Sequence, residues 1–192
     1  MKPKTRQSGF TLIELLVAVL IITILGVIAV SQYQRAVDKA KFAQYKAIAH
    51  TLYTAEREYY LTHGEHSHNL KDLMFQVPPP SNKECTYVSK PANKADGDYY
   101  DCKRKGDSTP YLRYGIFDYG HNIQVGDYNI RYVQFIQGGP VDRDGLRNYD
   151  AKEGEIACFA RTDRHRRVCA SLGPFKRTAK APSNGDWNKY FF

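Results

Sequence analysis

The sequence predicts an α+β fold in which one long N-terminal helix packs against an antiparallel β-sheet of about four strands. Three observations predict it: an apolar run over residues 10–30, a one-sided apolar pattern over residues 31–63, and alternating apolar and polar side chains beyond Tyr111. A helix laid on one face of a sheet suits this order of elements. The chain of 192 residues leaves room for one globular domain after the helix.

The apolar run has the length of a membrane span. Between Phe10 and Val30 the only ionisable side chain is Glu14, and about 21 residues of helix rise about 31 Å, the thickness of the hydrocarbon core of a bilayer. A carboxylate in that core costs roughly 2.5 to 3.5 kcal/mol. Glu14 therefore needs a partner.

Residues 1–9 form a short leader with basic charge and no acid. Its basic residues are Lys2, Lys4 and Arg6. Positive charge before the span favours a cytoplasmic N-terminus and an outward C-terminus. No small-residue cleavage site ends the apolar run, so we expect this helix to be kept in the mature protein.

The string Gly9-Phe10-Thr11-Leu12-Ile13-Glu14 after a basic leader resembles the class III signal of type IV pilins and of type II secretion pseudopilins. The resemblance implies that a prepilin peptidase cuts between Gly9 and Phe10 and methylates the new amine of Phe10. It also implies that Glu14 approaches the Phe10 amine of a neighbouring subunit in a helical filament. The alternative is an ordinary single-span anchor whose acid lies near the membrane interface.

Two positions depart from the family pattern. Ser31 stands where many pilins have a helix-breaking proline, and Thr23 stands where a glycine is common. Since proline interrupts a helix, the sequence leaves open whether this helix loosens on assembly.

Beyond Val30 the helix is predicted to be amphipathic and to end near His63-Gly64, because glycine suits the left-handed C-cap. The predicted apolar face comprises Tyr33, Val37, Ala40, Gln44, Ile48, Leu52, Ala55 and Tyr59. The predicted solvent face comprises Arg35, Asp38, Lys39, Lys46 and Glu56.

Residues 64–110 are predicted to be a connecting region, with a short helix near residues 69–75 and a hairpin between the first two cysteines. Residues 111–192 are predicted to form the sheet and a disulfide-closed C-terminal region. Alternation predicts strands over residues 111–116 and 130–135, with an extension near Ile123 and Val125. Further strands are expected at residues 155–160 and 167–172, and a basic mobile segment at 173–186 before an aromatic end that docks on the sheet. That end comprises Trp187, Tyr190, Phe191 and Phe192.

Four cysteines, Cys85, Cys102, Cys158 and Cys169, all follow the predicted membrane crossing, so they are expected in an oxidising space as two disulfides. Three pairings are open. Short loop closure favours Cys85 with Cys102 and Cys158 with Cys169. Zinc is the competing interpretation, but no Cys-x-x-Cys spacing occurs.

Three charged clusters are candidate binding sites. The formal net charge is +8, and an anion or DNA patch is predicted at Arg164, Arg166, Arg167 and Lys176; the alternative is a solvated loop. A metal site is the weaker interpretation of His63, His66 and His68. The acids Asp142, Asp144, Asp150 and Glu153 suggest calcium, but basic residues lie among them and the spacing is not that of an EF-hand. We therefore expect no metal and no cofactor.

The sequence holds no familiar catalytic motif, so an enzyme is not expected. The resemblance implies a structural pilin, major or minor, that polymerises with itself and with other pilins. It implies three further partners: a prepilin peptidase, an inner-membrane assembly platform, and membrane lipid before assembly. The expected location is the bacterial inner membrane and then a cell-surface filament. Alternatives are a periplasmic type II secretion pseudopilin, a DNA-binding minor pilin and an anchored surface enzyme.

Overall fold

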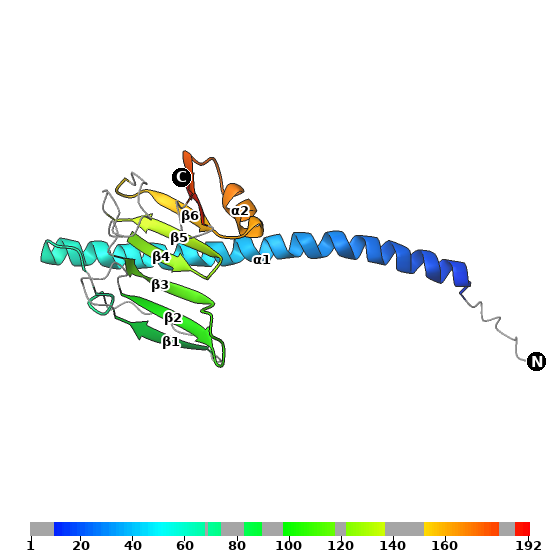
Figure 1. The fold of residues 1–192 in the computed structure, drawn as a ribbon, viewed down its shortest axis with the longest axis horizontal. Helices are drawn as coiled ribbons and strands as arrows, with labels where there is room; N and C mark the ends of the chain where they lie inside the picture. Colours follow the sequence, from blue (N-terminus) through cyan, green and yellow to red (C-terminus); the bar gives the residue numbers. More distant parts are fainter. Residues whose placement is uncertain are drawn as a thin grey trace, which may run out of the picture. The chain divides into compact units, whose positions relative to one another are not determined.

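The computed structural model describes residues 10–67, 69–73, 83–89, 98–117, 122–136, 152–180 and 187–192. The chain divides into two compact units, Met1–Asp38 and Lys39–Phe192, here called the N-terminal unit and the globular unit. Figure 1 shows the order of their helices and strands.

The first element is a helix of 52 residues, α1 (Leu12–His63). Of the described helices it is the one long and apolar enough to cross a membrane, and its most apolar stretch has no buried side chain. Ser31 does not interrupt it, because serine keeps the backbone N–H that proline lacks. The Ser31 hydroxyl donates to the carbonyl oxygen of Ile28 at 2.9 Å. Gly64 follows with φ of 76°, as the predicted C-cap requires.

Within the globular unit, α1 buries a stripe with helical spacing. The buried residues Phe42, Tyr45, Ala49, Leu52 and Glu56 recur every three or four positions. The predicted face was right at Leu52, and the predicted Ile48, Ala55 and Tyr59 are partly buried against the core. The centre of the buried stripe nevertheless lies about one position further along the helix than predicted.

Individual side chains show the same error. Ala40 and Gln44, expected inside, are exposed. Glu56 and Asp38, expected in solvent, are only 0% and 4% exposed. The polar character of a side chain misled the prediction, because a carboxylate can be buried when it is hydrogen-bonded.

The sheet has eight antiparallel strands in the order β1-β2-β3-β4-β5-β6-β8-β7. Their bounds are β1 (Lys83–Val88), β2 (Tyr99–Arg104), β3 (Leu112–Phe117), β4 (Asn122–Gly126), β5 (Ile130–Phe135), β6 (Ile156–Ala160), β7 (Arg177–Lys180) and β8 (Asn188–Phe191). The long helix packed on an antiparallel sheet is confirmed, but the predicted number of about four strands was too low.

The additional strands lie where the alternation of apolar and polar side chains along the sequence is weak. β1 and β2 form the hairpin around the first two cysteines, inside the segment predicted as a connection. β7 lies in the segment predicted to be mobile, and the aromatic end supplies β8, which pairs with β6 and β7. In the region predicted as a short helix, Asp72 N–H instead closes a turn on the Asn69 carbonyl at 3.1 Å.

The predicted strand over residues 167–172 was wrong, because the segment forms a second helix, α2 (Asp163–Ala170). Thr162 is its N-cap and accepts from the backbone N–H of His165, which satisfies one of the donors that a helix start leaves free. Asp163 lies in the first turn, and Val168 and Cys169 form its buried side. The Thr-Asp pair before this run was the missed signal for a helix start.

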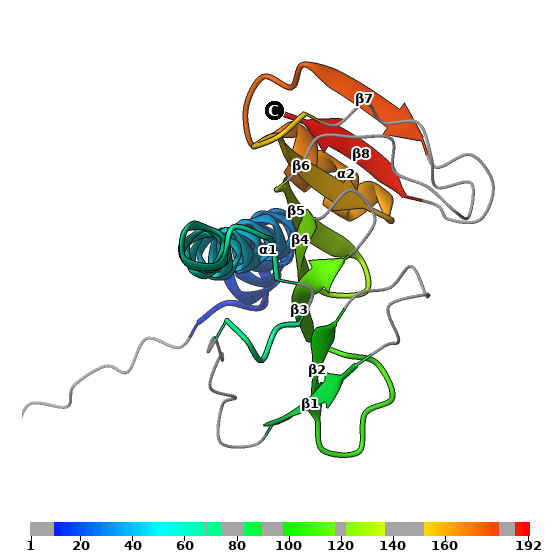
Figure 2. The same cartoon turned by 90° about the vertical axis from the view of Figure 1, so that its left-hand side faces the viewer.

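The two faces of the sheet support two clusters. Residues 39–63 of α1 lie against one face (Figure 2), where Phe42, Leu52, Tyr114, Ile123 and Tyr132 belong to the main core. The Phe42 and Tyr132 rings have centroids 5.8 Å apart.

The opposite face carries a smaller cluster, formed by Val133, Phe135, Ala157, Phe159 and Phe191. Strand residues thus alternate between two apolar environments. This explains why β5 and β6 are buried along nearly their whole length.

Two disulfides join strands and helix. Cys85 and Cys102 are directly opposite each other in the β1–β2 register. Cys158 of β6 is bonded to Cys169 of α2, so the second disulfide fixes α2 to the sheet. These are the two pairings that short loop closure favours.

Lys189 gives a prediction for stability as a function of pH. It is 2% exposed and lies over the Phe159 ring at 5.2 Å, and burial lowers the pKa of Lys189 to about 8. In the unfolded chain the same amine keeps its proton to higher pH, so between these two values the unfolded state binds more protons. We expect the free energy of unfolding to rise with pH above about 8, by on the order of 2 kcal/mol.

Tyr132 limits that rise, since burial raises its pKa to about 12 and the unfolded phenol loses its proton first. Above about pH 10 stability should therefore fall again. Urea titrations of the full chain in detergent across this range test both slopes. Lys189→Met should remove the rise and the exposed control Lys105→Met should keep it; an unchanged rise in Lys189→Met would contradict the assignment.

Candidate functional site

The start of α1 is organised by a reciprocal contact between Thr11 and Glu14. One carboxylate oxygen of Glu14, Oε2, accepts from the Thr11 backbone N–H and from the Thr11 hydroxyl, each at 2.8 Å. The Glu14 backbone N–H points back to the Thr11 hydroxyl oxygen at 3.3 Å. This is a capping box, in which residues three apart satisfy donors that the helix start would otherwise leave unpaired.

The cap fixes the position of the only acid in the apolar segment. Glu14 lies in the first turn of α1, where the partial positive charge of the helix dipole favours an anion. Both hydrogen bonds from Thr11 end on the same oxygen. The second carboxylate oxygen therefore remains oriented by the helix and can accept a further cation or donor.

The surroundings of Glu14 are apolar and exposed. Phe10 is 88% exposed and Leu12 84%, and each described side chain from residue 10 to residue 36 is exposed. Apolar surface on this scale is not stable in water. It requires lipid or other apolar helices around it.

Sequence reasoning identified Phe10 and Glu14 but missed Thr11. The signal was available, because Thr-x-x-Glu immediately before an apolar run is the pattern of a capping box. Gly9, the predicted processing position, lies outside the described residues.

The predicted anion patch is divided by the structure. Arg164 and Arg167 are exposed on α2. Arg166 instead bonds the Asp163 carboxylate at 2.9 Å and the Arg161 carbonyl at 3.3 Å. Lys176 lies outside α2, with its backbone N–H donating to the Phe191 carbonyl at 2.7 Å.

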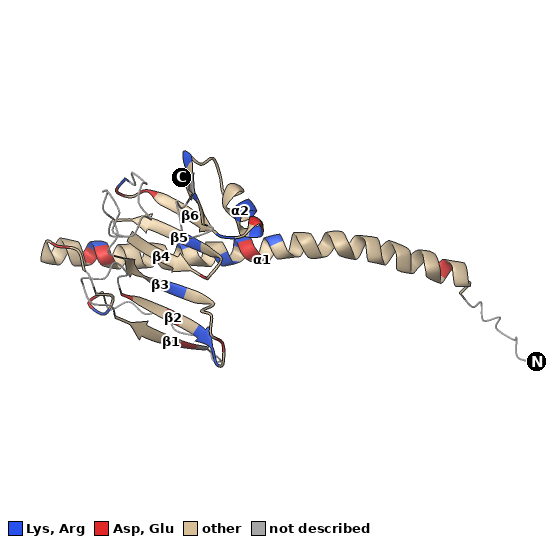
Figure 3. Cartoon of the chain, viewed as in Figure 1, with Lys and Arg blue, Asp and Glu red and all other residues tan. Residues whose placement is uncertain are grey.

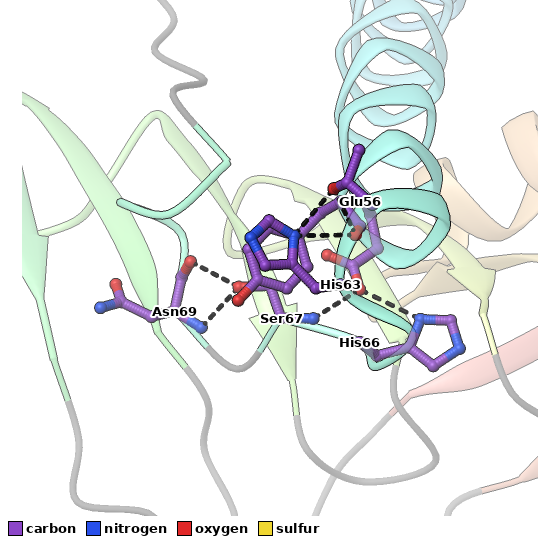
Figure 4. A network of polar contacts seen from close by, with 7 residues as sticks. Glu56, His63, His66, Ser67 and Asn69 are labelled. Atoms are coloured by element: carbon purple, nitrogen blue, oxygen red, sulfur yellow. Dashed lines mark hydrogen bonds and ion pairs between the residues drawn. The ribbon is translucent and has the colours of Figure 1, made fainter.

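The predicted histidine cluster takes part in different contacts, shown in Figure 4. His66 Nδ1 contacts Glu56 Oε1 at 3.1 Å. His63 instead stacks on Tyr59, with ring centroids 4.0 Å apart. His68 and the acids Asp142, Asp144 and Asp150 lie outside the described residues. Among the residues that are described, no group of three or more His, Cys, Asp or Glu side chains could hold a metal ion.

Glu56 has a structural role that the sequence did not reveal. Its Oε1 atom accepts from the buried Ser67 backbone N–H at 2.9 Å as well as contacting His66. The carboxylate thereby ties the segment after α1 back onto the helix.

Replacing Glu56 tests this contact. Glu56→Ala leaves the Ser67 N–H buried without this acceptor, and we expect it to lower the free energy of unfolding by about 1 to 3 kcal/mol. Glu56→Gln keeps an acceptor and should cost less. Urea melts of the full chain in detergent measure both, with exposed Glu58→Ala as the control; equal effects of Glu56→Ala and Glu58→Ala would contradict the role.

Comparison with known proteins gives a consistent result. The family model for the prokaryotic N-terminal methylation motif matches residues 4–30. The type IV major pilin protein PilE1 of Neisseria gonorrhoeae is 35% identical over 86 residues, which are 45% of this chain and 52% of that relative. A fimbrial protein of Neisseria meningitidis serogroup B is 41% identical over 61 residues, 32% of this chain and 36% of the relative.

A more distant relative covers more of the chain. The type IV major pilin protein PilA of Myxococcus xanthus is 27% identical over 135 residues, 70% of this chain and 61% of the relative. The chain spans about half the length of the first curated relatives that it matches. No solved structure matches it. The methylation motif, the capped apolar helix and these similarities identify the chain as a type IV pilin-like protein.

Proposed function

We propose that the chain is a structural subunit of a type IV pilus and that it polymerises through its N-terminal helix into an extracellular filament. The observation that carries the proposal is the Thr11–Glu14 capping box at the head of the apolar, exposed N-terminal part of α1, within the matched methylation motif. Relatives named type IV major pilin and fimbrial protein support it.

The proposed processing supplies a partner for Glu14. A prepilin peptidase would cut between Gly9 and Phe10, and the new Phe10 amine would be methylated and remain charged. An ammonium group on Phe10 of a neighbouring subunit can bind the Glu14 oxygen that Thr11 does not occupy. The pair would remove an uncompensated charge from an apolar environment, so assembly would offset the cost of inserting Glu14.

The same helix explains two environments for one subunit. Before assembly, lipid of the inner membrane would cover the apolar residues 10–30; after assembly at an inner-membrane platform, the helices of other subunits would cover them. We propose a structural and not a catalytic role, in keeping with the pilin names of the relatives.

Surface filaments test this function. Filaments sheared from cells that express the chain should contain it, and mass spectrometry should find a peptide that begins with N-methylated Phe10. Gly9→Val should block the cut and leave the chain in the membrane fraction. A leader that stays uncut in the wild-type chain, or filaments confined to the periplasm, would contradict the proposal.

A further inference from the structure

The globular unit has a basic end, defined as the end where residues 39–46 of α1 and the β2–β3 and β4–β5 turns lie (Figure 3). The Tyr45 hydroxyl of α1 donates to the Asp127 carboxylate in the β4–β5 turn at 3.1 Å. Arg113 at the start of β3 pairs with Gly126 at the end of β4. The β2–β3 turn therefore lies at the same edge of the sheet.

The start of α2 belongs to this end as well. The Arg161 backbone N–H donates to the Asn129 carbonyl at 2.9 Å, and the Arg161 guanidinium lies over the Tyr128 ring at 4.4 Å. Both partners are in the β4–β5 turn. Since α2 begins at Asp163, its first turn lies at the same edge. Three segments therefore bring charge to this edge: residues 39–46 of α1, the β2–β3 turn and the start of α2.

The charge at the basic end is predominantly positive. The basic residues of these segments are Lys39, Lys41, Lys46, Lys103, Arg104, Lys105, Arg161 and Arg164. Fewer acids lie there, and two of them are used internally: Asp127 accepts the backbone N–H groups of Asn129 and Ile130, and Asp163 pairs with Arg166. Glu84 and Asp107 are exposed but do not balance the cations.

An apolar groove opens beside these lysines. It has a volume of about 290 Å³ and is lined by Lys39, Phe42, Ala43, Lys46, Tyr132, Ile156, Leu172 and Phe192. Lys39 and Lys46 are exposed on α1, two helical turns apart, with long apolar stems that can lie along the groove while their ammonium groups face water. The groove therefore suits an occupant with an apolar body and an anionic group.

Among the described residues, the opposite end of the globular unit carries charges of both signs. Glu58 and Glu65 are exposed there, and so are Arg57 and Lys71. A second copy stacked end to end would thus meet mixed charge. A phospholipid combines the two features that the groove suits, apolar acyl chains and an anionic phosphate.

We propose that the basic end binds anionic phospholipid before the subunit enters a filament. The lipid phosphate lies between the ammonium groups of Lys39 and Lys46, and one acyl chain of the same lipid enters the groove beside Leu172. The proposal rests on the membrane-spanning role of α1 but not on polymerisation. Each basic residue near an anionic surface strengthens binding by about fivefold, so the lysine pair gives a clear preference over zwitterionic lipid.

Photocrosslinking in nanodiscs tests the site with the full chain. p-Benzoylphenylalanine replaces Leu172, and the nanodiscs contain either phosphatidylcholine alone or an equimolar mixture with phosphatidylglycerol. Mass spectrometry then identifies the crosslinked partner. We expect phosphatidylglycerol adducts to exceed phosphatidylcholine adducts in the mixture, and the preference to fall at least about fivefold in Lys39→Gln/Lys46→Gln.

A matched variant removes the same charge at the other end. Lys71→Gln/Lys152→Gln should keep the lipid preference, and higher salt should weaken it in the wild-type chain. Equal yields for the two lipids, an unchanged preference in Lys39→Gln/Lys46→Gln, or crosslinks to a second copy in place of lipid would overturn the proposal. Because this measurement requires no filament, a negative result here would not contradict the filament proposal, and a failure to find filaments would not contradict this result.

Discussion

Glu14→Ala will abolish filament assembly while the subunit remains in the membrane. Removing the carboxylate lowers the free-energy cost of inserting the apolar helix into the membrane by roughly 2.5 to 3.5 kcal/mol on insertion scales. The amount of subunit in the membrane fraction should therefore not fall. Assembly should fail because the Phe10 ammonium of the next subunit loses its partner. Surface filaments, counted by electron microscopy and compared with membrane-fraction immunoblots, measure the two effects separately.

Two further variants separate pairing between subunits from capping within one subunit. Glu14→Gln still accepts the Thr11 N–H but has no charge, whereas Thr11→Val removes the hydroxyl that donates to Glu14 at 2.8 Å and leaves the charge. If Glu14 acts through its charge, Glu14→Gln should reduce filaments nearly as far as Glu14→Ala, and Thr11→Val should have a milder effect of about 1 kcal/mol on the helix start. Normal filaments from Glu14→Gln would show that the cap alone matters.

The N-terminal part of the molecule could be predicted because its signals are local. The apolar run of membrane length predicts the exposed helix, and the glycine after His63 predicts where it ends. Both signals lie in a short continuous stretch of sequence. The continuous helix across Ser31 also followed from local chemistry, since no proline interrupts it.

The structure of the globular unit was harder to predict, because contacts between residues distant in sequence determine it. Glu56 looks like a solvent residue in the sequence, and only the Ser67 N–H and His66, which come after the end of α1, explain its burial. β8 is short and pairs with β6, which is distant in sequence, so no local pattern could place it in the sheet, and the edge strand β7 pairs only with β8. In the strand predicted at residues 167–172, the apolar and basic residues fit the two-residue period of a strand as well as the 3.6-residue period of a helix. The N-cap at Thr162 favours the helix.

The candidate site was predicted in part for the same reason. Phe10 and Glu14 follow from one continuous string, and Thr11 could have been added from its spacing to Glu14. The lysines of the basic end could not be grouped from sequence. Lys39 and Lys105 belong to different elements, and the β4–β5 turn that links those elements is placed by the Tyr45–Asp127 contact.

Loss of the Cys158–Cys169 disulfide is expected to be the most destabilising change in the globular unit. Both cysteines are fully buried in the main core, and the bond fixes α2 on β6 across a separation of 11 residues. In the chain-entropy account a loop of this size contributes roughly 3 kcal/mol, and removing a native disulfide costs about 2 to 5 kcal/mol. We expect Cys158→Ala/Cys169→Ala to lie in the upper half of that range, because it also leaves a cavity in the core.

The Cys85–Cys102 disulfide is the matched control. It closes a longer separation of 17 residues, so loop closure alone predicts a slightly larger stabilisation. Cys85 is only half-buried, however, in the edge strand β1, and local fraying there need not disturb the core. Cys85→Ala/Cys102→Ala should therefore lower the free energy of unfolding by less than Cys158→Ala/Cys169→Ala does, as measured by urea unfolding of the full chain in detergent. An equal or larger loss would show that loop closure, and not the attachment of α2 to the core, determines how much each disulfide stabilises the protein.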